Sequence, residues 1–168
     1  SVFNVFDQNN ISINGLNSNN GIMLFSSANN NTFVNNTVSL WGTRNNCGVR
    51  VHSSVSNIFD QNNISINGTE DNIGVYILAS SKSNTIRNNN VSVRGNANGN
   101  YGVNVQLSSV LNIFDNNLAI NIIYSAIFFS GKNSNSFNLD IISFCCTSES
   151  KLKGGKTLLY ISFSDDMK

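Results

Sequence analysis

The sequence predicts an all-β protein: a right-handed parallel β-helix (solenoid) of about five to six coils, each of 23–28 residues with three short strands. Three observations predict this fold. A repeat of that length runs along most of the 168-residue chain, the apolar residues alternate with period two, and no segment has helical apolar spacing. In such a solenoid each coil buries its apolar side chains against its neighbours.

The repeat is clearest in two segments that start 53 residues apart. Residues 1–15 (SVFNVFDQNNISING) and 54–68 (SVSNIFDQNNISING) share 13 of 15 positions. Related phrases are NTFVNNTVSLWG from Asn31, NTIRNNNVSVRG from Asn84 and NIFDNNLAIN from Asn112. A second phrase, G-Φ-x-Φ with Φ apolar, follows in most units. Each unit therefore holds three short alternating segments, which we expect to be strands.

Equivalent positions of the units predict five inward columns of apolar side chains. The columns are Phe6, Phe33, Phe59, Ile86, Phe114 and Phe137; Ile11, Val38, Ile64, Val91 and Leu118; Ile13, Leu40, Ile66, Val93 and Ile120; Ile22, Val49, Val75, Val103 and Ile127; and Leu24, Val51, Ile77, Val105 and Phe129. A buried large apolar side chain contributes about 1.5–3 kcal/mol before entropy. These columns therefore suffice for a core.

Asparagine accounts for 34 residues, and one Asn recurs at the start of every unit. This column is Asn4, Asn31, Asn57, Asn84, Asn112 and Asn135. Stacked Asn amides can hydrogen-bond from rung to rung, and Asn tolerates the left-handed backbone of a tight corner. We therefore predict a structural Asn ladder. We expect the glycines of the next corner to serve the same backbone purpose. These glycines are Gly15, Gly42, Gly68 and Gly95.

The composition changes near the C-terminus, because the last 30 residues contain no Asn. We expect residues 1–144 to form the β-helix repeats and residues 145–168 to form a tail. A strand at 157–163 could cap the open edge of the solenoid, or the tail could be a non-native end. Ser1 begins in the middle of a unit, so we expect a segment of a longer protein. Its first coil would favour end-to-end self-association.

The repeats resemble the NosD-type right-handed parallel β-helix proteins, within the pectin lyase-like fold. GIMLFSSANNNTFVNNTVSL (21–40) and GVNVQLSSVLNIFDNNLAI (102–120) carry the resemblance. The Asn-rich, weakly charged composition is also similar to adhesin-like surface proteins of methanogenic archaea. The resemblance implies a structural or adhesive segment of a cell-surface or secreted protein, although this fold hosts many functions. N-x-S/T sequons, which fit an extracellular protein, occur at Asn10, Asn30, Asn35, Asn63, Asn67 and Asn90.

Charge and composition argue against several classes of partner. Ten basic and nine acidic residues leave a net charge of +1, so we expect no nucleic-acid partner. No apolar run is long enough to span a bilayer, so we expect no membrane insertion in this segment. The single histidine, His52, has no cluster of ligands around it, and we predict no metal or cofactor. Cys47 lies four rungs, about 19 Å, from Cys145 and Cys146, too far for a disulfide.

Parallel β-helices include pectin-degrading lyases and polygalacturonases, so an enzymatic role must be weighed. Asp60 and Asp115 fall in one outward column about 9–10 Å apart, near the spacing of an inverting carboxylate pair. Arg87 lies between them, which favours a surface Asp–Arg–Asp ladder. Glu70 and Asp71 are a weak calcium signal. We predict no catalytic residue here. The alternative is a carbohydrate-active domain whose catalytic coils lie outside this segment.

A binding surface is the more plausible functional feature. Two outward columns are Met23, Arg50, Tyr76, Asn104 and Phe128, and Phe25, His52, Leu78, Gln106 and Ser130. Five of these residues form what we call the binding strip: Arg50, His52, Tyr76, Asn104 and Gln106. Aromatic stacking and amide or guanidinium hydrogen bonds suit carbohydrate or a cell-surface protein partner. An ordinary outer surface is the other interpretation.

Overall fold

A computed structural model of the chain describes residues 3–106, 109–121, 125–130, 136–143 and 163–164. All regular elements in these ranges are strands, and all their pairings are parallel. The described residues contain no helix that is long and apolar enough to cross a membrane.

Four successive coils have three strands each. They are β1 (Val5–Asp7), β2 (Asn10–Asn14) and β3 (Asn20–Phe25); β4 (Thr32–Val34), β5 (Thr37–Trp41) and β6 (Cys47–His52); β7 (Ile58–Asp60), β8 (Asn63–Asn67) and β9 (Ile73–Leu78); and β10 (Thr85–Arg87), β11 (Asn90–Arg94) and β12 (Tyr101–Val105). The chain continues with β13 (Ile113–Asn121), β14 (Ser125–Ser130), β15 (Ser136–Ser143) and β16 (Phe163–Ser164).

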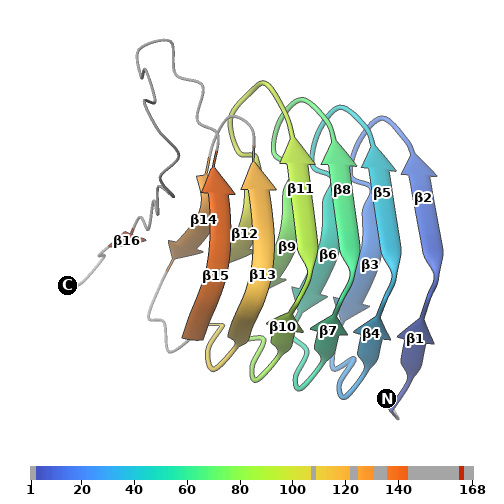
Figure 1. Cartoon of the computed structure of the whole chain (residues 1–168), viewed down its shortest axis with the longest axis vertical. Helices are drawn as coiled ribbons and strands as arrows, with labels where there is room; N and C mark the ends of the chain where they lie inside the picture. The colour runs from blue at the N-terminus through green and yellow to red at the C-terminus, as the bar shows by residue number, and fades with distance from the viewer. Residues whose placement is uncertain (1–2, 107–108, 122–124, 131–135, 144–162, 165–168) are drawn as a thin grey trace.

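The strands stack as a parallel β-solenoid, which confirms the predicted fold (Figure 1). The first strands of the coils pair in the order β1-β4-β7-β10-β13, the second strands in the order β13-β11-β8-β5-β2, and the third strands in the order β16-β14-β12-β9-β6-β3. We call these the first, second and third faces. Strand β13 joins the first two faces because it runs through both strand positions.

The number of three-strand coils is lower than predicted, about four rather than five to six. In β13 and β15 the first two strands of a unit are continuous, although β13 keeps Asn116 (φ 49°) before the ladder residue Asn117. The pairing of these two strands shifts between Asp115 and Asn117, where Leu139 takes the place opposite Asn117. The sixth unit therefore lacks the corner Asn that separates the two strands elsewhere.

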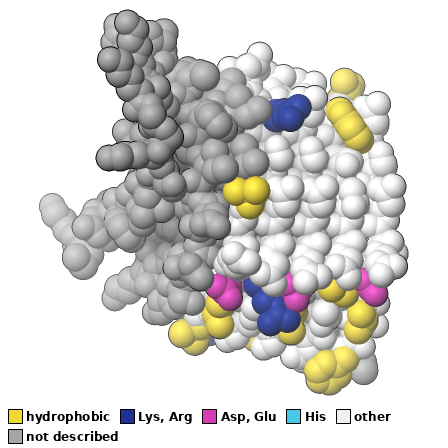
Figure 2. Space-filling model, in the orientation of Figure 1, with side chains coloured by type: hydrophobic (Ala, Val, Ile, Leu, Met, Phe, Trp, Pro, Cys, Tyr) yellow, Lys and Arg dark blue, Asp and Glu magenta, His cyan; other side chains and the backbone are white. Residues whose placement is uncertain are grey.

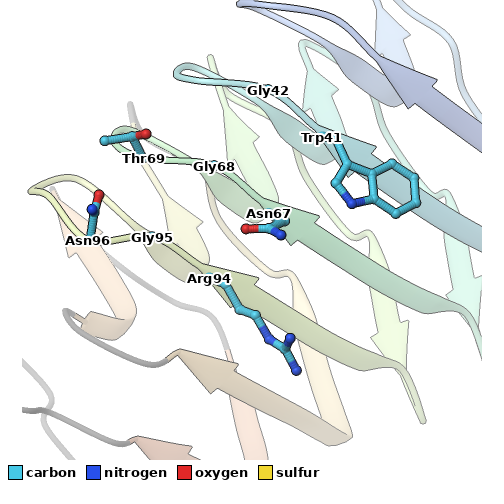
Figure 3. A pocket seen from close by; sticks show the side chains of 8 residues that line it. All are labelled: Trp41, Gly42, Asn67, Gly68, Thr69, Arg94, Gly95 and Asn96. Carbon is cyan, nitrogen blue, oxygen red and sulfur yellow. The ribbon is translucent and has the colours of Figure 1, made fainter.

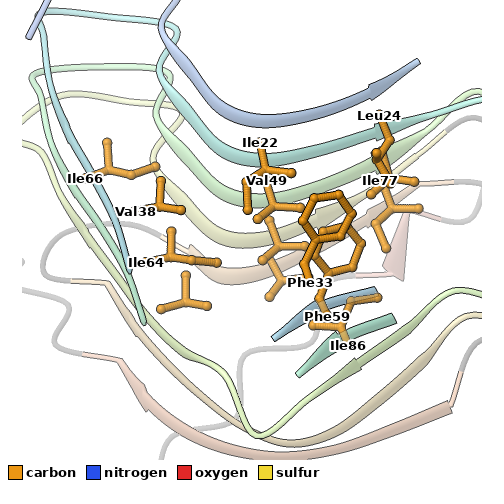
Figure 4. Close-up of a cluster of buried hydrophobic side chains, with 14 of the residues drawn as sticks. Ile22, Leu24, Phe33, Val38, Val49, Phe59, Ile64, Ile66, Ile77 and Ile86 are labelled. Carbon is orange, nitrogen blue, oxygen red and sulfur yellow. The ribbon is translucent and has the colours of Figure 1, made fainter. Parts of the chain in front are cut away.

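The apolar columns form the core as predicted (Figure 4). Phe6, Phe33 and Phe59 stack face to face, with ring centroids 4.7 and 4.9 Å apart. The columns of the second and third faces also keep the predicted register through the first four coils. At Gly48 an added Cβ would collide with Ile64, which explains the glycine that opens the G-Φ-x-Φ phrase.

Two column positions were predicted wrongly: Leu118, and Ile120, which pairs with Ser92 and not with Val93. Leu118 pairs with the exposed Asn90 and is itself only half-buried, whereas Val91 pairs with Ala119. The prediction aligned Leu118 with Val91 by assuming that this unit is one residue shorter than the others. The structure keeps Asn117 aligned with Asn89 and lets the apolar pattern slip by one. Because a one-residue slip moves a side chain to the other face, the amide column outweighs the apolar pattern here.

The predicted Asn ladder is present in the first five units. Each amide Nδ2 donates to the Oδ1 of the next Asn, from Asn4 to Asn31, Asn57, Asn84 and Asn112, over 2.9–3.1 Å. The sixth predicted member, Asn135, lies outside the described residues. Two further ladders were not predicted. The second ladder is Asn9, Asn36, Asn62, Asn89 and Asn117. The third ladder is Asn19, Asn46, Asn72 and Asn100.

The corners differ from the prediction in which residue takes the left-handed conformation. The ladder Asn residues do not have positive φ; the residue before each one does, at every rung except Asn4. Asn35 (φ 54°) and Gln61 (φ 56°) are examples. The left-handed residue turns the chain, and the following Asn then points its amide into the stack. The corner glycines also lack positive φ.

Three predictions fall on residues outside the described ranges. Cys145 and Cys146 lie there, while Cys47 is a free thiol. Residues 157–162 of the predicted capping strand also lie there. Phe163 does pair with Phe129 of β14, in β16. The boundary between repeats and tail at 144/145 stays a prediction.

Candidate functional site

The third face brings most of the predicted binding strip together. Arg50, Tyr76 and Asn104 occupy one outward column in successive coils, as their Cα register shows. His52 lies in the neighbouring column and pairs with Leu78. Gln106 follows the end of β12, where its backbone N–H donates to Ile77.

Contacts within the strip divide it into two groups. The Arg50 guanidinium lies 5.5 Å from the centroid of the Tyr76 ring, and the Tyr76 hydroxyl donates to Gln106 Oε1 over 3.0 Å. His52 instead packs on Phe25, with ring centroids 4.6 Å apart, and its Nδ1 lies 3.1 Å from the Ser53 hydroxyl. The Arg50–Tyr76–Gln106 contacts thus form a connected polar cluster, with Asn104 beside it.

Two side chains that we expected to face solvent are buried. Leu78 is 5% exposed and Asn104 only 2%. Successive rungs are about 4.8 Å apart, so a large side chain covers a short neighbour in its column. Asn104 lies in the rung next to Tyr76. The strip is therefore a partly closed surface and not an open row of side chains.

Two buried polar atoms of the strip have no hydrogen-bond partner among the described residues. They are Arg50 Nε and Asn104 Oδ1, which lie in the rungs on either side of Tyr76. A buried polar group without a partner costs about 1–3 kcal/mol. One atom is a donor and the other an acceptor, but both have almost no accessible surface, so a ligand hydroxyl can bond to them only after the side chains that cover them move.

Burial favours the neutral forms of Tyr76 and Cys47, the two ionisable groups that lie near Arg50. It raises the pKa of the Tyr76 hydroxyl, although the Arg50 charge opposes the shift. It raises the pKa of the Cys47 thiol to about 12, again against the Arg50 charge. Cys47 donates to the Val49 carbonyl and is 4% exposed. The Arg50–Tyr76–Gln106 cluster therefore has one cation, Arg50, beside neutral hydrogen-bonding groups, which suits binding.

On the first face, Arg87 pairs with Asp60, which is one half of the Asp–Arg–Asp ladder that the sequence predicts. Arg87 Nη2 lies 2.8 Å from Asp60 Oδ2, and Arg87 Nε donates to the same oxygen. Asn88 Nδ2 donates to the other carboxylate oxygen of Asp60. Figure 2 shows the row of acidic side chains with a dark-blue basic patch between two of them. Both Asp60 oxygens are engaged, so the geometry does not provide a pair of free carboxylates.

Glu70, one of the two acidic residues considered for calcium, takes part in an ion pair. Glu70 pairs with Arg44, with Oε1 and Nη1 3.7 Å apart. Within the described ranges, no three His, Cys, Asp or Glu side chains are placed to hold a metal ion.

A groove that the sequence analysis missed lies at the corner after the second face (Figure 3). Trp41, Asn67 and Arg94 end β5, β8 and β11 and form one outward column. The groove also includes Thr69 and Asn96 and has a volume of about 430 Å³. We call it the corner groove. The available signal was the residue before each corner glycine, which is Asn, Trp, Asn and Arg in successive units.

No protein-family model, curated protein or solved structure matches the chain.

Proposed function

We propose that the chain is a structural repeat segment of a cell-surface or secreted protein, and that the binding strip takes up carbohydrate. The observation that carries the binding proposal is the pair of unpartnered buried atoms, Arg50 Nε and Asn104 Oδ1, around Tyr76. The adhesive role, the extracellular location and the resemblance to NosD-type and adhesin-like proteins rest on the repeat pattern.

The solenoid supports the structural part of this proposal. Long-range contacts repeat at intervals of 26–28 residues along all three ladders, so added units extend the same core. Each coil depends only on its neighbours, which suits a rigid spacer. End-to-end association remains a prediction.

Carbohydrate suits the strip better than an anionic or purely apolar ligand. Once the side chains that cover these atoms move, a sugar hydroxyl can donate to Asn104 Oδ1, and another can accept from Arg50 Nε. The half-buried Tyr76 ring offers an apolar surface between them. The alternative of a carbohydrate-active domain has no comparable observation in its favour, because the carboxylate of Asp60 is fully engaged.

Asn104→Ala tests the strip because binding and stability should respond differently. The substitution removes an oxygen that has no partner, so the free energy of unfolding should stay the same or rise. Binding on a glycan array should be lost. The matched control is Asn90→Ala, an exposed Asn on the second face.

Two results would overturn the proposal. One is undiminished binding of the same glycans by the Asn104→Ala protein. The other is an array on which wild-type protein retains no glycan.

A further inference from the structure

The corner groove is a direct consequence of the third Asn ladder. An added Cβ at Gly42 would lie 2.7 Å from Asn46 Oδ1, and one at Gly68 would lie 2.6 Å from the amide of Asn72. At Gly95 it would collide with Asn100. The ladder therefore requires glycine at this corner in each coil. Successive glycines leave a trough without side chains that runs across the coils.

The walls of this trough have complementary chemistry. Trp41 is 45% exposed, which is unusual for an indole on such a polar surface. Arg94 is exposed and forms no ion pair among the described residues. Asn67 lies in the rung between them, and Thr69 and Asn96 complete the lining (Figure 3).

The spacing of these groups defines the shape of a ligand. Trp41 and Arg94 are two rungs apart, about 9–10 Å between Cα atoms. A ligand that uses both must have an apolar flat face and an anionic group separated by about two sugar units. The trough runs along the stack of coils, so a linear chain fits it better than a compact molecule.

We propose that the corner groove binds a linear saccharide that carries carboxylates. The C–H face of one pyranose ring stacks on the Trp41 indole. A carboxylate further along the chain accepts two hydrogen bonds from the Arg94 guanidinium. Asn67 and Thr69 bond the hydroxyls between these points. The site is separate from the binding strip, and the proposal does not rest on it.

Trp41 is the single tryptophan of the chain, so its fluorescence reports directly on the groove. We would titrate the whole protein with a tetrasaccharide of alternating glucuronate and N-acetylglucosamine. The comparison ligand is the neutral N-acetylglucosamine tetramer. We expect a saturable fluorescence change with the acidic ligand and weaker binding of the neutral one.

Arg94→Gln should weaken the acidic ligand about tenfold or more, the loss expected for a charge-assisted pair, and leave the neutral ligand unchanged. Arg44→Gln is the matched control. It makes the same charge change on an exposed side chain outside the groove, and it should leave both affinities unchanged. Asn104→Ala should also have no effect, which separates this site from the strip.

The proposal is overturned by any of three results. These are no saturable fluorescence change at millimolar acidic ligand, equal affinity for the two ligands, or an equal loss in the Arg94→Gln and Arg44→Gln proteins. Because both arginines are exposed, the variants should keep the melting temperature of the wild type.

Discussion

Removing one amide from the second ladder should destabilise the solenoid far more than removing its exposed neighbour. Asn62 is buried in the middle of that ladder. Its Oδ1 accepts from the backbone N–H and from the Nδ2 of Asn36, both over 2.9 Å. Its Nδ2 donates to Asn89 Oδ1 over 2.9 Å and to the Phe33 carbonyl over 3.0 Å. Asn62→Ala removes all four bonds.

The cost follows from the groups that lose their partners. Two buried donors of Asn36, the backbone N–H and one Nδ2 hydrogen, lose their acceptor, and the Phe33 carbonyl loses a donor. At about 1–3 kcal/mol per unsatisfied buried group, the two donors alone give about 2–6 kcal/mol. A domain is stable by about 5–15 kcal/mol, so this loss is a large fraction of the total.

Urea denaturation of Asn62→Ala and Asn63→Ala measures the difference. Asn63 is the next residue in the chain but faces solvent, so its variant should stay within about 0.5 kcal/mol of wild type. Asn62→Asp gives a second comparison, because it retains the acceptor and loses the donor. Equal unfolding free energies for the Asn62→Ala and Asn63→Ala proteins would refute the view that the ladders stabilise the fold.

Three further predictions concern the core, a corner and the buried thiol. Phe59→Asp puts a carboxylate at a position that is 1% exposed and should unfold the neighbouring coils. Asp60→Asn loses only a surface ion pair worth about 1 kcal/mol or less. Circular dichroism melts compare the two variants, and equal melting temperatures would contradict the assigned faces. Leu111 has φ 58° at a corner where other units have Asn or Ser. Leu111→Asn should therefore stabilise the protein by about 1 kcal/mol and raise its melting temperature in calorimetry by about 2–4 °C. No rise would show that this corner is unstrained. Burial raises the pKa of Cys47 from 9.0 to about 12, so the thiol of the unfolded chain ionises first as the pH increases, and the free energy of unfolding falls between these two values. Chemical denaturation of Cys47→Ser across that pH range should show a smaller fall. An identical fall in the two proteins would exclude this linkage.

The fold could be predicted because its two strongest signals are local and repeat along the chain. Phe6, Phe33 and Phe59 recur at nearly constant intervals, and alternation on either side fixes which face they occupy. Leu118 shows where this reasoning fails. In its unit, one register aligns the apolar residues with those of the previous unit, and a register shifted by one residue aligns the ladder Asn. The sequence does not show which of the two registers is more stable. Buried amide bonds decide it.

The ladders and corners were only partly predictable. The first ladder follows from an Asn that opens every unit. The sequence also contained the signal for the third ladder, because each member directly precedes the third strand of its coil and only Asn100 follows a loop that is one residue longer. The corner glycines were predicted to be needed for a left-handed backbone, with positive φ. Their actual cause is the Asn side chain packed against them, a contact between residues four or five positions apart that no propensity reveals.

The candidate sites depend on burial, which outward columns do not reveal. The sequence places Arg50, Tyr76 and Asn104 in one column, but it cannot show that Asn104 is buried without a partner. Similarly, Trp41 and Arg94 belong to different units, and only the stacking of glycine corners turns them into walls of one groove.

Spin-label distances along one outward column test the stacked register most directly. Asn10, Asn63 and Asn90 share a column of the second face with Thr37, and all three are exposed. Cysteines at pairs of these positions, with the native cysteines changed to serine, carry the labels. The account predicts Cα separations of about 5 Å for 63–90, 9–10 Å for 10–63 and 14–15 Å for 10–90. Distances that do not increase in these equal steps would contradict the parallel stacking of one coil per repeat.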